Sequence, residues 1–191
     1  MSLTMTTDSK TLSEEIRLAR QAAQEAEAFA ELYRRHVTRV YRYHLAHTGN
    51  VEDTEDLTSQ TFLAALEGIR SFRGDGSFAA WIMGIAARRR ALFFRGRRPE
   101  VPLETASFFP DPQPDPAQAA FSRLEAESLS RLIQHISPDR REALILRFFS
   151  GLTFAEAARV LHKSEAAVKM LVARGLDDLR QRLSPVLEVK K

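Results

Sequence analysis

Apolar residues recur at three- and four-residue steps along much of the chain, which is the periodicity of amphipathic α-helices. In the first half, one such run covers residues 29–41 and stops near residues 48–50, where glycine and asparagine interrupt the pattern. Asp53 or Thr54 can cap the next helix. That helix carries two apolar stripes within residues 57–69, more than a single packing contact requires, so we expect it to pack on two sides.

A turn follows at residues 72–76, and Ser77 then opens a third helix, which continues from Phe78 through Leu92. Before the first of these three helices lie about 25 residues rich in alanine, glutamate and glutamine. These residue types favour helix, so the composition predicts an additional N-terminal helix.

The second half is also helical in pattern, and its first helix covers residues 124–136. Ser137 and Pro138 then supply the N-cap and the first position of the next helix. Gly151 ends the helix that these residues begin. Residues 153–156 match the capping box and start a short helix, and Ser164 caps a last one after a brief turn. This order predicts a helix-turn-helix, whose last helix turns these side chains inward: Val168, Leu171, Val172, Leu176 and Leu179.

Residues 99–120 separate the two halves, and they are rich in proline and lack periodicity, which indicates an extended linker. The linker contains four acidic residues and no lysine or arginine. We therefore expect an all-α protein with two small helical domains joined by a proline-rich acidic linker. The expected divisions are an N-terminal extension (1–25), a first domain (26–98), the linker (99–120), a helix-turn-helix domain (121–184) and a tail (185–191).

The composition narrows the class of protein. The chain has 191 residues, of which 44% are hydrophobic, and this suits a globular protein. It has no cysteine, which excludes disulfides and any cysteine-ligated metal. The first ten residues form no signal-peptide core and no segment approaches the roughly 20 apolar residues that span a bilayer, so we expect a cytoplasmic protein.

The net charge is only +3, but the charge is unevenly distributed. Residues 81–98 contain six arginines and no carboxylate. Trp81, Phe93 and Phe94 lie among them, and basic residues interleaved with aromatic ones suit single-stranded DNA. The competing interpretation is a solvated basic surface with aromatic side chains in the core.

The last helix of the helix-turn-helix is the candidate probe for the major groove of DNA. Its outward positions, opposite the apolar stripe, are Glu165, Lys169, Met170, Ala173 and Arg174. Lys169 and Arg174 suit phosphates or guanine, and the free N–H groups at Ser164 suit a phosphate. The competing interpretation is a structural helical pair with solvated cations.

No catalytic site is evident, and we expect neither enzymatic activity nor a cofactor. His44 and His47 could share a helix face, but no third metal ligand lies nearby, so surface or core roles are favoured. The carboxylates of residues 52–56 suit a helix N-terminus. The sequence contains no phosphate-binding glycine loop and no nucleophile motif.

Three segments in order resemble regions 2 and 4 of extracytoplasmic-function sigma factors of the sigma-70 family. They are VEDTEDLTSQTFLAA (51–65), FRGDGSFAAWIMGIA (72–86) and GLTFAEAARVLHKSEAAVKMLVARGLDDLR (151–180). The resemblance covers residues 26–183, and its specificity comes from the order and spacing of the three segments around a proline-rich linker.

For the first domain, the resemblance implies two surfaces. One binds the clamp helices of the β′ subunit of core RNA polymerase through Glu55, Asp56, Leu57, Gln60, Phe62 and Leu63. The other opens the minus-10 element of the promoter and holds a flipped base through Trp81, Arg88, Arg89, Arg95, Gly96, Arg97 and Arg98, the last four forming a loop with Pro99.

For the second domain, the resemblance implies that it sits on the β flap and reads the minus-35 element. The residues implied are Lys163, Ser164, Glu165, Lys169, Met170, Ala173 and Arg174. The linker would follow the RNA-exit channel, and an anti-sigma protein would hold the factor inactive. Promoter DNA and core polymerase are thus the expected partners, with no insertion into a membrane.

The chain departs from the family pattern at several positions. Arg88 and Leu92 stand where the family often has asparagine and aspartate, and Met170 and Leu171 replace polar or basic residues of the probe helix. His162 replaces a common turn glycine, and histidine tolerates the left-handed conformation better than most residues. The promoter sequence is therefore left open.

Two other functions compete with this interpretation. One is a helix-turn-helix regulator that binds duplex DNA without polymerase, and the other is a helical adaptor with no nucleic-acid role. Transcription that depends on core polymerase distinguishes the three.

Overall fold

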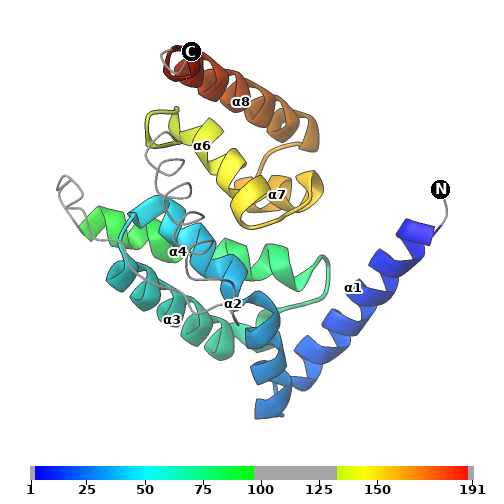
Figure 1. The fold of residues 1–191 in the computed structure, drawn as a ribbon. Helices are drawn as coiled ribbons and strands as arrows, with labels where there is room; N and C mark the ends of the chain where they lie inside the picture. The colour runs from blue at the N-terminus through cyan, green and yellow to red at the C-terminus, as the bar shows by residue number, and fades with distance from the viewer. Residues whose placement is uncertain (1–2, 97–132, 189–191) are drawn as a thin grey trace, which may run out of the picture.

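The computed structural model describes residues 3–96 and 133–188, and within these ranges the chain is helical with no strand (Figure 1). The predicted linker and most of the helix predicted over residues 124–136 lie outside the described residues. The elements are α1 (Leu3–Gln21), α2 (Ala26–Thr48), α3 (Val51–Gly68), the 3-10 helix η1 (Ile69–Ser71), α4 (Phe78–Gly96), α6 (Pro138–Leu144), the π-helical η2 (Ile145–Phe149), α7 (Phe154–Leu161) and α8 (Glu165–Glu188).

The helix ends of the first half follow from local chemistry. Gly49 ends α2 in the left-handed conformation (φ 63°), and its N–H donates to the carbonyl of Leu45. The prediction that Asp53 or Thr54 caps α3 is wrong, because Asn50 accepts the N–H of Asp53 at 2.9 Å. Thr54 instead lies one turn inside the helix, fully buried.

The helix-turn-helix is confirmed at each of its predicted ends. Thr153 and Glu156 form the full capping box of α7, and the side chain of Ser164 accepts the N–H of Ala167 at 3.2 Å to start α8. Between them, His162 takes the left-handed conformation (φ 52°), which the turn requires. Ser137 precedes Pro138 as predicted, although its side chain makes no capping hydrogen bond. The helix α8 continues to Glu188, into the stretch expected to form the tail.

The N-terminal extension is a helix, as its composition predicted. Residues of its second half pack on α2, and Ala19 and Ala22 are buried there. The carboxylate of Glu15 lies 3.0 Å from Nε2 of the buried His36. The first half of α1 extends away from the rest of the molecule (Figure 1).

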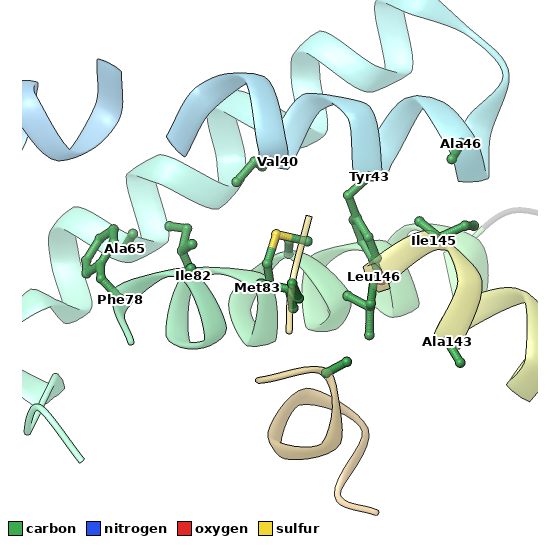
Figure 2. Close-up of a cluster of buried hydrophobic side chains, with 14 of the residues drawn as sticks. Val40, Tyr43, Ala46, Ala65, Phe78, Ile82, Met83, Ala143, Ile145 and Leu146 are labelled. Atoms are coloured by element: carbon green, nitrogen blue, oxygen red, sulfur yellow. The ribbon is translucent and has the colours of Figure 1, made fainter. Parts of the chain in front are cut away.

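The two predicted domains pack directly against each other, an arrangement that the sequence did not indicate. Helix α4 lies against α7, and α2 lies against η2. Figure 2 shows Tyr43, Ile82 and Met83 of the first domain in one cluster with Ile145 and Leu146 of the second. All five side chains are fully buried, so the apolar core is continuous across the domain boundary.

His44 occupies the middle of this core without a charged partner. Its Nε2 lies 3.0 Å from the hydroxyl of Thr61, which itself donates to the carbonyl of Leu57 at 2.7 Å. The hydroxyl therefore accepts from Nε2–H, and Nδ1 is the unprotonated nitrogen. Burial, together with the nearby His47 and Arg90, lowers the pKa of His44 to about 3, so the ring is neutral.

A neutral buried histidine makes the fold sensitive to mild acid. Below the ordinary pKa of 6.5 the unfolded chain takes up a proton that folded His44 refuses, so the free energy of unfolding falls as the pH falls. We expect a loss of roughly 2 kcal/mol between pH 6.5 and about pH 5 in urea titrations. His44→Gln should remove most of this slope, leaving the contribution of His47, whose pKa burial also lowers. The exposed His162→Asn is the control, and an equal slope in His44→Gln would contradict the assignment.

Candidate functional site

The predicted probe helix presents its outward residues to solvent. Lys169 and Arg174 are exposed, as are the other five residues of the predicted set: Lys163, Ser164, Glu165, Met170 and Ala173. On the opposite side, Val168 and Val172 are buried in the second domain. The helix-turn-helix therefore offers a continuous polar face around one exposed methionine, which is the geometry that a major-groove probe needs.

The cations of this face differ in how they are held. The ammonium of Lys169 lies 2.7 Å from Glu165 and 5.7 Å from the ring centroid of Phe154, while Lys163 pairs with Asp139 at 3.2 Å. Arg174 has no ion-pair or hydrogen-bond partner in the part of the chain that the structure describes. Exposed pairs such as Lys169 with Glu165 are weak, so a phosphate can replace the carboxylate at small cost.

The arginine block lies along the second half of α4. Arg88 and Arg95 are exposed, Arg89 is half-buried, and Gly96 is exposed at the end of the helix. The prediction that Arg95 and Gly96 belong to a loop is wrong, because both lie in the last turn of α4. Arg97, Arg98 and Pro99 fall outside the described residues.

The aromatic residues of α4 divide between core and surface. Trp81 is half-buried and stacks obliquely on Phe72 and Phe78, with ring centroids 5.5 and 5.3 Å away. Phe94 is 45% exposed and contacts the half-buried Phe93 edge-on. Phe94 thus lies on the surface beside Arg95, where it can meet a base, whereas Trp81 presents only part of its ring.

One arginine of the block is engaged inside the molecule. The guanidinium of Arg90 lies 3.2 Å from the carboxylate of Glu142, which comes from α6 in the other domain. Glu142 is only 8% exposed. Arg90 is therefore paired and only partly exposed, whereas Arg88 and Arg95 are exposed.

An exposed apolar patch covers adjoining parts of α2 and α3. Leu63 is 58% exposed, and Leu66 and Tyr33 are 46% and 43% exposed. We call these three residues the α2–α3 patch. Sequence reasoning included Leu63 in the predicted polymerase contact but left out Tyr33 and Leu66. Both are apolar residues that belong to the three- and four-residue spacing of their helices.

Two residues predicted to contact the clamp helices cannot do so directly in this fold. Leu57 is fully buried and Phe62 is 5% exposed, because α3 packs against both α2 and α4 and uses both apolar stripes. Phe62 supports the patch from below, with its ring 4.7 Å from that of Tyr33. Glu55 and Asp56 are exposed and Gln60 is half-buried, so these polar members of the set remain accessible.

The described residues hold no cluster of three or more histidines and carboxylates that could bind a metal ion. Among the helices of the same ranges, none has the length and apolar content to span a membrane. His44 and His47 are buried core residues, as the sequence favoured.

Comparisons with known proteins identify the family. A family model described as sigma-70 region 2 matches residues 32–99, and one described as sigma-70, region 4 matches residues 126–179. The ECF RNA polymerase sigma factor EcfG of Rhodopseudomonas palustris (strain TIE-1) is 32% identical over 142 residues, which cover 74% of this chain and 75% of EcfG. The chain belongs to the extracytoplasmic-function (ECF) sigma factors. Members of this family are DNA-binding factors of transcription initiation.

Other ECF relatives extend the match along the chain. BldN of Streptomyces coelicolor is 35% identical over 167 residues, and although these cover 86% of this chain, the chain spans only 63% of the length of BldN. A solved structure of the sigma factor CnrH in complex with the cytosolic domain of CnrY superposes with a TM-score of 0.72 at 25% identity. That superposition covers 90% of this ECF chain and 97% of CnrH, so it includes both domains and confirms the predicted all-α architecture.

Proposed function

We propose that this ECF sigma factor directs core RNA polymerase to specific promoters as a non-enzymatic, cytoplasmic initiation factor. The observation that carries the proposal is the presence, on one chain of this family, of two exposed basic helix faces and one exposed apolar patch. Each surface suits a different partner, since cations suit DNA phosphates and exposed apolar area suits a protein.

The second domain, within residues 121–184, reads the minus-35 element. Lys169 and Arg174 are the principal contacts, because both are exposed and extend from the outer face of α8. The N-terminus of α8 at Ser164 offers N–H groups to a phosphate. Lys163, Glu165, Met170 and Ala173 complete the probe surface, and the rest of the domain rests on the β flap.

The first domain, within residues 26–98, opens the minus-10 element and docks on the β′ clamp helices. The exposed Arg88 and Arg95, with Phe94 beside them, suit the phosphates and bases of a single strand. Arg89, Trp81 and Gly96, together with Arg97 and Arg98 beyond the described residues, complete this proposed surface. The α2–α3 patch, with Glu55, Asp56 and Gln60 around it, is the proposed contact for the clamp helices.

An anti-sigma protein is the proposed regulatory partner. The support comes from the similarity to CnrH, which was solved in complex with the cytosolic domain of CnrY and aligns over both domains. A protein of this kind would need to contact surfaces that the sigma factor uses for polymerase.

Transcription in vitro tests the proposal against its alternatives. Purified chain and core RNA polymerase are incubated with a library of genomic fragments, and RNA 5′ ends are sequenced. We expect start sites that share upstream sequence elements and that vanish when either protein is omitted. A helix-turn-helix regulator would shift the DNA without polymerase and yield no new start sites, and an adaptor would do neither. Either of these outcomes would refute the proposal.

A further inference from the structure

A cleft with a volume of about 250 Å³ lies where α2 of the first domain meets η2 of the second. We call it the α2–η2 cleft. Three arginines and no carboxylate are among the described residues that line it. Its α2 wall presents Arg35, Thr38, Arg39 and Arg42, and its facing wall includes Phe148 and Ser150. The cleft therefore combines positive charge, hydroxyl groups and an aromatic ring.

The charge on the α2 wall is concentrated by the helix period. Arg35, Arg39 and Arg42 are spaced by four and three residues, so they share one face of α2, where like charges repel one another. Arg35 pairs with Glu31 and Glu14 at 2.7 and 3.1 Å. Arg39 and Arg42 form no ion pair within the described ranges, and Nη1 of Arg39 lies 3.4 Å from Nδ1 of His36. An anion between these two guanidinium groups would relieve the repulsion.

The facing wall contains a hydroxyl group without a hydrogen-bond partner. Ser150 is 2% exposed, and its Oγ makes no hydrogen bond in the part of the chain that the structure describes. Buried hydroxyl groups are nearly always hydrogen-bonded, because leaving a buried donor unsatisfied is costly. A ligand with acceptor oxygens, held by the arginines opposite, would satisfy this donor.

The aromatic ring of Phe148 is accessible beside these polar groups. Phe148 is 56% exposed although it belongs to η2, a π-helical turn, and such turns are frequent at functional sites. An exposed ring next to arginines can stack on a flat heterocycle while the cations hold phosphates. A volume of about 250 Å³ is below the roughly 300–1,000 Å³ that encloses a whole drug-sized ligand. The cleft therefore suits the phosphates of such a ligand, with its heterocycle outside against Phe148.

Both walls are held in place by contacts along the same elements. Tyr43, the residue after Arg42 on α2, donates to Glu142 of α6 at 2.6 Å, and α6 continues directly into η2. The N–H of Ser150 donates to the carbonyl of Ile145 at 3.0 Å. The walls thus need little rearrangement when a ligand binds, which reduces the entropic cost of binding.

We propose that the α2–η2 cleft binds a nucleotide through its phosphates. Arg39 and Arg42 hold the phosphate oxygens, since guanidinium groups match phosphate geometry with paired hydrogen bonds. The Ser150 hydroxyl donates to a phosphate oxygen from the facing wall, and Phe148 stacks on the base. Stacking of this kind does not select one base, so ADP and GDP are equivalent ligands. The site goes beyond the proposed function and does not depend on it.

Isothermal titration calorimetry of the full chain tests the site with ADP, GDP, adenosine and inorganic pyrophosphate. We expect both nucleotides to bind, pyrophosphate to bind about tenfold more weakly because it lacks the stacking base, and adenosine to give no heat. Replacing both Arg39 and Arg42 with alanine should weaken ADP binding by about tenfold or more. Phe148→Ala should lower the affinity for ADP to that for pyrophosphate and leave the affinity for pyrophosphate unchanged.

Ser150→Ala separates a ligand-binding role from a structural one. The variant should bind ADP about fivefold more weakly, because one hydrogen bond to a phosphate oxygen is lost. Its thermal midpoint without ligand should not fall, since the hydroxyl has no partner in the free chain. For the parent, the thermal midpoint should rise with ADP concentration, because the ligand binds only the folded chain.

The matched control is Arg34→Ala, which removes another exposed arginine of α2. Arg34 pairs with Glu27 and Glu31 at 2.9 and 3.0 Å and does not line the cleft, so its loss should leave the affinity for ADP unchanged. Circular dichroism checks that each variant is folded. Absence of binding by both nucleotides, adenosine binding as tightly as ADP, or a folded Arg39 and Arg42 double variant with parental affinity would overturn the proposal. These titrations contain no polymerase or DNA, so their outcome is independent of the transcription experiment.

Discussion

Replacing Leu63 with aspartate is expected to weaken the association of this sigma factor with core RNA polymerase by more than a hundredfold. Leu63 is the most exposed residue of the α2–α3 patch, at 58%, and lies between the polar Gln60 and the apolar Leu66 along α3. A carboxylate at the centre of a buried protein interface loses its hydration without gaining a partner. We expect a cost of about 3 kcal/mol, or more than a hundredfold in Kd, measured by fluorescence anisotropy of labelled chain titrated with core enzyme.

The fold itself should tolerate the Leu63→Asp change, because substitutions at exposed positions usually alter stability by less than about 0.5 kcal/mol. Leu57→Asp cannot serve as this test, since Leu57 is fully buried and an unpaired charge there would unfold the domain. The matched control is Leu12→Asp, which changes another exposed leucine (38%) that lies on α1 and outside the α2–α3 patch. Unchanged affinity for Leu63→Asp would place the polymerase contact on another surface.

Helix ends were the best predicted features because they depend on a few neighbouring residues. The capping box of Thr153 and Glu156 and the Ser164 cap are defined by short-range hydrogen bonds that the sequence displays directly. The left-handed conformation of His162 agrees with the resemblance, which places a common turn glycine at that position. The start of α3 was misplaced because Asn50 and Asp53 can both cap a helix, and the sequence alone does not say which one stands at the boundary.

The candidate surfaces were predicted less evenly. Periodicity separated the inner and outer faces of α8 correctly, because only one side of that helix is covered: Val168 is buried and Met170 is exposed. On α3 the same reasoning recognised two apolar stripes, but it could not say which residues of each stripe the chain itself would cover. Leu57 and Phe62 proved to be covered by the chain itself, and Leu63 and Leu66 remained for a partner.

The closed arrangement of the domains could not be read from the sequence. Tyr43 and Glu142 are 99 residues apart, and nothing in the pattern around either residue indicates the other. The sequence marked Arg90 only as one member of a basic block, whereas the structure pairs it with Glu142. Tertiary packing therefore decides for each arginine whether its side chain is solvated or paired, and local periodicity does not record that packing.

Replacing both Lys169 and Arg174 with alanine is expected to weaken promoter binding by polymerase carrying this sigma factor. Each lost phosphate contact removes about 0.9 from the slope of log K against log salt concentration, so the double variant should flatten the slope by about 1.8. At fixed salt we expect a loss of about 2 kcal/mol, or about thirtyfold. Binding of a labelled promoter fragment is measured at several salt concentrations for the parent and for each variant.

The control for the double variant is Arg182→Ala, which removes a charge from the same helix at an exposed position outside the predicted probe residues. The guanidinium of Arg182 donates to the carbonyl of His135 at 3.2 Å and so points toward the body of the domain. Its replacement should leave the salt slope unchanged. Because Lys169 is paired with Glu165 in the free chain and Arg174 is not, Arg174→Ala alone should account for the larger share of the lost affinity. Equal salt slopes for the double variant and the parent would contradict the assignment of α8 as the probe helix, because the double variant changes no charges other than those of Lys169 and Arg174.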